Sequence, residues 1–510
     1  MKIFNKILIG ALGVMMLSCT DYLEDNESPN SPLIDNLAPT KKLAAAQSDI
    51  FRVITGDNRN YESSVRTSSL NQLGSIWSGV WSVDAANWTG AYSQEYTGNI
   101  NNAFYDSIWD WIYLKSMNFE NIKNYESDTY DNHKAIAMIL ESFYMQYIVD
   151  LYGDVPYTEA WILNPTPVYD DQKFVYRSLY NQLDEAIELI QAADSFDEPV
   201  GGEDVMLNGN MQQWIAFANT VKLRYLIRQS EVTDPEIQGF ITQEINELRG
   251  ATFISSDVTI NPGYNATSAD RQNPFYGAYG YSPSGEPVSR RKLPVASEHI
   301  ANIINSSRTD DPRRAMWFIP DGSGEIVGVP QGEVGVNVPD YVSFFGSGII
   351  PTDTSIGSSM DGYVMLLSEA KFLLAEAEQR WGGFGNSAEQ YFNEGVMASF
   401  DRFGLTIDEY DTYMNRISNI DGFGWNGTSD KIEAIINQKW LALMLTNGME
   451  AYLDNLRTGY PEIELPLTNT TGGFPKRLLY PSSEIQGNAA NVPTVSLSDA
   501  LANGSFWVAN

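Results

Sequence analysis

The sequence predicts a mainly helical protein that carries one long, loop-rich insertion. Two observations support this prediction. Apolar residues recur with helical spacing in paired segments, whereas residues 251–360 lack that spacing and are rich in Gly, Pro, Ser and Asn. Loops of this length in a compact protein are usually functional or disordered. Their aromatic content favours an ordered insertion with a few short strands, laid over a helical scaffold.

The clearest helix is expected near residues 136–151, where apolar side chains recur at i, i+3, i+4 and i+7. Gly153 follows at the position of a left-handed C-cap, and Pro156 prevents the helix from continuing. A second amphipathic segment precedes it, so the two are expected to pack as a hairpin. Hairpins of this kind, related in spacing to tetratricopeptide repeats, are predicted at residues 104–152, 174–229, 362–403 and 430–457.

The first eighteen residues have the pattern of an export signal. The apolar run Ile7–Leu17 is too short to cross a bilayer as a permanent helix. Ser18 then precedes Cys19, as in lipoprotein signals, where the thiol accepts a diacylglycerol and the peptide is cut just before it. Cys19 is the only cysteine in 510 residues, and an exported protein gains nothing from a lone free thiol. We therefore expect residues 1–18 to be a lipoprotein signal peptide; the alternative is an ordinary signal peptide.

Residues 19–40 are expected to be an acidic lipid tether, because they contain five acidic residues, three prolines and no Lys or Arg. Acidic residues just after a lipidated cysteine resemble the surface-export signal of Bacteroidetes lipoproteins, which indicates the outer face of the outer membrane. Residues 41–510 then form the ligand-binding domain. The net charge of −33 repels polyanions, so we expect no nucleic acid partner.

Motifs of common enzymes are missing, and we predict that the protein is not an enzyme. His133 and His299 are the only histidines, and there is no HExxH, GxSxG, P-loop or GxGxxG motif. We expect no catalytic residue, no metal site and no cofactor. Structural calcium stays open at Asp321–Glu325, where a turn is the favoured interpretation. A surface glycosidase also stays open, since it needs only two carboxylates.

Aromatic residues are plentiful, with 12 Trp, 28 Tyr and 22 Phe. Sugar rings have apolar faces that stack on exposed aromatic rings, and the same kind of surface can hold peptide side chains. Three aromatic clusters lie in loops rich in Gly, Ser and Asn. We predict ligand contact for each, with a buried loop anchor as the alternative. The candidate residues are Trp77, Trp81, Asp84, Asn87 and Trp88; Tyr276, Tyr279 and Tyr281; and Trp425.

Short motifs in a fixed order along the chain resemble a known family. They are the lipoprotein start Ser18–Glu24, the turn Tyr152–Tyr157, the helix Trp214–Arg228, Glu369-Ala370 with Ala375-Glu376-Ala377, Gln438-Lys439-Trp440, Gly448–Tyr452, Arg457–Pro461, and Arg477–Pro481 with Glu484 and Asn488. Each motif is weak alone, but their number and order are specific. Together they resemble the SusD/RagB family of outer-membrane nutrient-binding lipoproteins over nearly the whole chain.

This resemblance implies four tetratricopeptide-like helix pairs, in agreement with the periodicity. It also implies a partner, a TonB-dependent SusC-like outer-membrane transporter, over which the lipoprotein acts as a hinged lid. The expected function is capture of oligosaccharides for that transporter; the alternative from the same family is capture of oligopeptides. The matching motifs are mostly helical, so none is transferred as a ligand-contact residue, and the aromatic clusters stay an inference from the residues.

Overall fold

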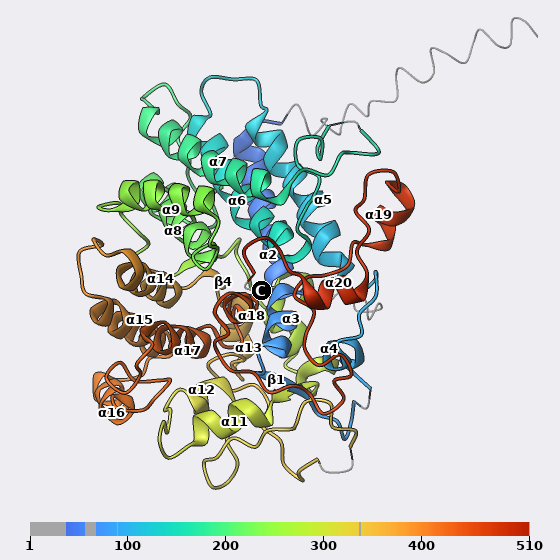
Figure 1. The fold of residues 1–510 in the computed structure, drawn as a ribbon, viewed down its shortest axis with the longest axis vertical. Helices are drawn as coiled ribbons and strands as arrows, with labels where there is room; N and C mark the ends of the chain where they lie inside the picture. Colours follow the sequence, from blue (N-terminus) through green and yellow to red (C-terminus); the bar gives the residue numbers. More distant parts are fainter. Residues whose placement is uncertain (1–36, 57–67, 89, 163, 336–337, 509–510) are drawn as a thin grey trace, which may run out of the picture.

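The structure is a computed structural model (Figure 1), which describes residues 37–56, 68–88, 90–162, 164–335 and 338–508. The predicted signal peptide 1–18, the lipid site Cys19 and most of the predicted tether lie outside the described residues. Within the described part of the chain, no helix is both long and apolar enough to cross a membrane.

The four predicted helix pairs are present, which confirms the mainly helical fold. Helix α6 is buried along nearly its whole length, and Gly153 ends it with a φ of 79°, a conformation that favours glycine. The side chain of Asp171 caps α7 by accepting the N–H groups of Lys173 and Phe174. The paired helices are α5 (Asp106–Lys123), α6 (Asp131–Tyr152), α7 (Gln172–Ala192), α8 (Met211–Arg228), α14 (Leu367–Trp381), α15 (Ala388–Arg402), α17 (Lys431–Leu443) and α18 (Gly448–Thr458).

The structure also contains helices that the sequence patterns did not predict. Helix α2 starts at Pro39, so the last two residues of the predicted tether 19–40 are helical instead. Proline suits the first turn of a helix, and this helix buries Leu43 and Phe51 in the core. The added helices are α2 (Pro39–Thr55), α3 (Leu70–Trp77), α4 (Ser93–Thr97), α9 (Pro235–Leu248), α16 (Ile407–Ile417), α19 (Ser482–Gly487) and α20 (Leu497–Ala502).

The insertion 251–360 is ordered and carries short strands, as predicted, and it also contains short helices that the sequence patterns did not predict. Two antiparallel strand pairs join it to the scaffold: β1 (Trp81–Val83) with β3 (Pro294–Ala296), and β2 (Val258–Ile260) with β4 (Gly362–Met365). Strand β4 therefore occupies the start of the predicted hairpin 362–403, and the helix begins only at Leu367. The short helices of the insertion are α10 (Pro274–Tyr279), α11 (Glu298–Asn305), α12 (Arg314–Trp317) and α13 (Thr354–Ser359).

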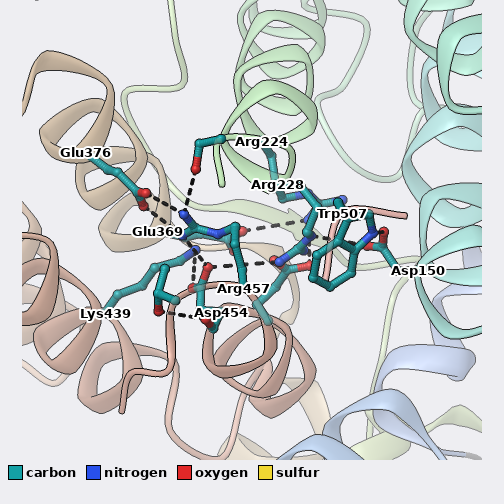
Figure 2. Close-up of polar contacts among 12 residues, drawn as sticks. Asp150, Arg224, Arg228, Glu369, Glu376, Lys439, Asp454, Arg457 and Trp507 are labelled. Atoms are coloured by element: carbon teal, nitrogen blue, oxygen red, sulfur yellow. Dashed lines mark hydrogen bonds and ion pairs between the residues drawn. The ribbon is translucent and has the colours of Figure 1, made fainter. Parts of the chain in front are cut away.

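Charged side chains meet in the interior, where five helices converge (Figure 2). Each of these side chains is at most 2% exposed. We call this set the buried ion network: Asp150 from α6, Arg224 and Arg228 from α8, Glu369 and Glu376 from α14, Lys439 from α17, and Glu450, Asp454 and Arg457 from α18.

The network is held by direct ion pairs. Arg457 contacts both oxygens of Glu376, at 2.5 and 2.9 Å, and also Asp454 at 3.0 Å. Lys439 lies 2.8 Å from the other oxygen of Asp454. Such two-pronged arginine contacts are stronger than neutral hydrogen bonds and fix the relative orientation of the groups. Helices that are distant in sequence are therefore locked together by charge as well as by apolar packing.

Replacing Arg457 with alanine is expected to destabilise the protein strongly. Removing one partner of a buried ion pair typically costs about 3–5 kcal/mol, because the remaining carboxylates stay buried without their partner. The measurement is the free energy of unfolding of R457A in urea. The matched control is R416A, which removes an exposed pair with Asp310 and should cost less than about 1 kcal/mol. Equal losses in the two variants would contradict a special role for the network.

Candidate functional site

Two of the predicted aromatic clusters lie next to each other in the structure. The ladder between β1 and β3 places Trp81 opposite Ala296, and the Trp81 ring contacts Tyr279 with ring centroids 5.3 Å apart. The hydroxyl of Tyr279 donates to Gln72 Oε1 at 2.7 Å. Residues that are nearly two hundred positions apart in sequence thus form one assembly.

The expectation that all of these rings are exposed is wrong for Trp77, Trp81, Tyr276 and Tyr279. All four are buried, with at most 1% of their surface exposed. Their segments are regular elements rather than open loops: Trp77 ends helix α3, Trp81 lies in β1, and both tyrosines lie in α10. The glycines near them permit close packing; a Cβ at Gly357 would lie 1.9 Å from the Tyr276 ring. These residues are structural anchors, which was the alternative interpretation.

Asp84 belongs to a turn that presents the next residues of the same cluster. It is 3% exposed, and its carboxylate accepts a hydrogen bond from the Asn87 side chain at 2.6 Å. Its carbonyl accepts the N–H groups of Asn87 and Trp88. Asp84 is therefore a turn residue rather than an open ligand contact, while Asn87 is exposed and Trp88 is half-buried.

Two further half-buried rings, Tyr92 and Tyr281, pack against the same hydrophobic core as Trp88. The guanidinium of Arg291 lies 5.7 Å from the centre of the Tyr281 ring, a cation–π contact that orients it. Burial is the main cause that raises the pKa of Tyr92 well above its ordinary value, and Tyr279 adds to it, while nearby Arg290 opposes it. The Tyr92 hydroxyl therefore stays protonated, and its oxygen lies buried beneath the half-buried ring.

These groups form what we call the aromatic surface: Asn87, Trp88, Tyr92, Tyr281 and Arg290. It combines apolar ring faces with an amide, the phenol of Tyr281 and a guanidinium. This is the chemistry that stacks on the faces of a sugar ring and binds its hydroxyl groups. The sequence pattern predicts Asn87, Trp88 and Tyr281 as ligand contacts; Arg290 is added from the folded chain, in which it lies near Tyr92.

Trp425 lies apart from the aromatic surface, in the loop between α16 and α17. Its ring packs on Phe392 with centroids 5.4 Å apart, and the Lys431 amine lies 5.4 Å from the ring centre. The ring is half-buried. The structure therefore does not bring Trp425 together with the other predicted residues.

Large pKa shifts of carboxyl groups lie in the protein interior, at Glu141, whose pKa burial raises to about 8, and in the buried ion network. Burial raises the pKa of Glu369 to about 7 and that of Asp150 to about 6. Such shifts often mark catalytic sites, but both side chains are fully buried and are surrounded by arginines of the scaffold (Figure 2). Their geometry supports a structural role.

The possible calcium segment Asp321–Glu325 and His133 make ordinary structural contacts. Asp321 accepts the N–H groups of Ser323 and Glu325, which closes a tight turn, as the favoured interpretation expected. His133 is buried, and its ring lies 3.1 Å from Glu203. In the described ranges, no three His, Cys, Asp or Glu side chains gather in a way that could hold a metal ion.

The raised pKa of Glu369 gives a pH test of the network. Its unfolded pKa is about 4.3 and its folded pKa is about 7, so the folded state binds the proton more tightly. This contribution to stability is present below pH 4.3 and is lost as pH rises towards 7.

Replacing Glu369 with glutamine should remove the loss of stability that accompanies ionisation of this side chain. Between pH 5 and pH 8, wild-type protein should lose roughly 1–3 kcal/mol more unfolding free energy than E369Q does. Urea unfolding of both proteins at several pH values measures the difference. Parallel curves for the two proteins would show that Glu369 is not the titrating group.

Comparisons with known proteins agree with the helical architecture. Residues 54–481 match the SusD-like family, whose description is starch-binding associating with outer membrane. A comparison with curated proteins gave no match.

Several solved structures share the fold. A chitin-binding SusD homologue from Flavobacterium johnsoniae is 22% identical, with a TM-score of 0.72, over 92% of this chain and 99% of its own. A SusD-like protein from Bacteroides thetaiotaomicron is 23% identical, with a TM-score of 0.71, over 91% and 98% of the two chains. A SusD homologue from Bacteroides vulgatus is 20% identical, with a TM-score of 0.70, over 92% and 98%. At these identities, the similarity establishes the fold.

Proposed function

Because the chain belongs to the SusD-like family, matching it over residues 54–481, we propose that it captures oligosaccharides at the aromatic surface and delivers them to a transporter. The transporter is a TonB-dependent SusC-like protein of the outer membrane, and the chain acts as its lid. The observation that carries the proposal is the group of half-buried rings, Trp88, Tyr92 and Tyr281, which pack against the buried core.

The chemistry of the aromatic surface favours a neutral glycan. Trp88 and Tyr281 offer ring faces for stacking, and Asn87 and Arg290 supply hydrogen-bond donors for hydroxyl oxygens. The solved relative from Flavobacterium johnsoniae is described as chitin-binding, and the family description names starch. Oligopeptides are the alternative ligand, because ring faces also hold apolar side chains.

Replacing Trp88 with alanine should weaken glycan binding by roughly tenfold or more, as truncation of a central aromatic contact does in other complexes. The mature protein is tested by calorimetry against chitin and starch oligosaccharides and against a panel of neutral peptides. The matched control is W425A, which removes a half-buried tryptophan outside the aromatic surface and should bind normally. Circular dichroism checks the fold of both variants.

Three outcomes would decide between the alternatives. Glycan binding that W88A loses and W425A keeps supports the proposal. Binding of peptides alone supports the oligopeptide alternative. Normal glycan binding by W88A contradicts the assignment of this surface.

The proposed lipid anchor at Cys19 is tested by replacing it with alanine. Acyl chains bury about 0.8 kcal/mol per methylene group, so wild-type protein should fractionate with the outer membrane. The C19A variant should lose the lipid and appear in soluble fractions. Mass spectrometry of the mature N-terminus provides the direct check, and an unmodified Cys19 in wild-type protein would contradict the anchor.

A further inference from the structure

An open groove lies between α5, the loop after α6 and α19, on elements other than those of the aromatic surface. Its volume is about 580 Å³, which is the size of a small-ligand pocket. We call it the acidic groove. Its walls include Trp109, Tyr113 and Trp161, with the carboxylates of Asp110 and Glu484 beside them.

The aromatic walls offer ring surfaces but few free donors. The Trp161 indole N–H donates to the carbonyl of Tyr113 at 3.2 Å. The Tyr113 hydroxyl donates to the carbonyl of Pro156 at 2.7 Å. Because both donors are used inside the protein, these rings are poorly suited to binding hydroxyl groups, in contrast to the aromatic surface.

The carboxylates give the groove a negative charge that nothing in its lining balances. Asp110 is exposed and accepts no hydrogen bond from the described residues. Burial raises its pKa first, and the neighbouring carboxylates of Asp106 and Glu484 raise it further. Glu484 accepts one hydrogen bond, from the Tyr169 hydroxyl at 2.7 Å. No Lys or Arg is among the residues that line the groove, so a bound cation would relieve this repulsion.

Exposed aliphatic side chains lie in the groove lining, at Leu114, or directly follow lining residues along the chain. Leu114 is 65% exposed and Ile162 is 60% exposed, and Val168 and Ile485 beside the lining residues are also exposed. Exposed apolar groups gathered around a groove mark interaction surfaces in soluble proteins. A protein segment would cover this rim, whereas a small sugar would leave it in water.

We propose that the acidic groove docks a segment of a partner protein in which an arginine or lysine is flanked by apolar side chains. The cation lies against the Trp161 and Tyr113 rings and pairs with Asp110 and Glu484. The apolar neighbours of the cation cover Leu114 and Ile162. The chain's own residues 19–36 do not fit, because they carry five acidic residues and no Lys or Arg.

The test uses two defined peptides and the mature full-length chain. The basic probe is acetyl-Leu-Arg-Leu-Arg-Leu-amide, and the acidic probe has Glu in place of each Arg. Fluorescence polarisation of labelled peptides should show binding of the basic probe and none of the acidic one. The double variant D110N/E484Q should weaken binding of the basic probe by about tenfold or more, as loss of interfacial charge pairs does.

A matched control separates specific docking from general attraction to an acidic protein. The variant E389Q/D401N removes two exposed carboxylates of α15 and should bind the basic probe normally. A second variant, L114S/I162S, keeps every charge and changes only exposed side chains, so it tests the rim even if D110N/E484Q folds poorly. It should also weaken binding several-fold.

The results overturn the proposal if the acidic probe binds equally, if E389Q/D401N loses as much affinity as D110N/E484Q, or if L114S/I162S binds normally. Loss of chitin or starch oligosaccharide binding in D110N/E484Q would instead assign the groove to sugars. The outcome is independent of the proposed glycan site, because W88A should bind the basic probe as wild-type protein does.

Discussion

The architecture depends on burying charge between helices that lie far apart in the sequence. Asp150 of α6 accepts a hydrogen bond from the Trp507 indole at 2.7 Å and lies 3.3 Å from Arg228 of α8. Arg228 in turn pairs with Glu450 of α18 at 2.5 Å. A buried charge without its partner is costly, so these helices must be in place together. The network thereby ties the helix pairs and the end of the chain into one scaffold.

This scaffold explains how a loop-rich insertion can present an ordered surface. Strand β3 of the insertion pairs with β1, and the Trp81 ring packs between Tyr279 and Phe345. Gln72 of α3 joins the Tyr279 and Tyr105 hydroxyls through hydrogen bonds of 2.7 and 2.6 Å. Trp88 packs against this buried core, so the proposed ligand-contact ring rests on well-packed neighbours, as precise binding requires.

The two candidate surfaces differ in chemistry. The difference depends on whether their hydrogen-bond donors are already bonded within the protein. The aromatic surface has a phenol and a guanidinium beside its rings, which suit hydroxyl oxygens. In the acidic groove, the indole of Trp161 and the hydroxyl of Tyr113 are already bonded to backbone carbonyls, and carboxylates remain. The proposed ligands are therefore different, a neutral glycan for the first surface and a cationic segment for the second.

The sequence by itself determined the helical class, the four helix pairs and the family resemblance, because helical spacing and short motifs are local properties. It also predicted Asn87, Trp88 and Tyr281 as candidate contacts, since aromatic residues beside glycine and asparagine form a local pattern. Exposure is not local. Only the tertiary structure decided that Trp77 and Tyr279 are buried, and that Trp109 and Trp161 line the same groove. Burial depends on which distant segments cover a ring, and here long-range strand pairs and buried ion pairs bring those segments together.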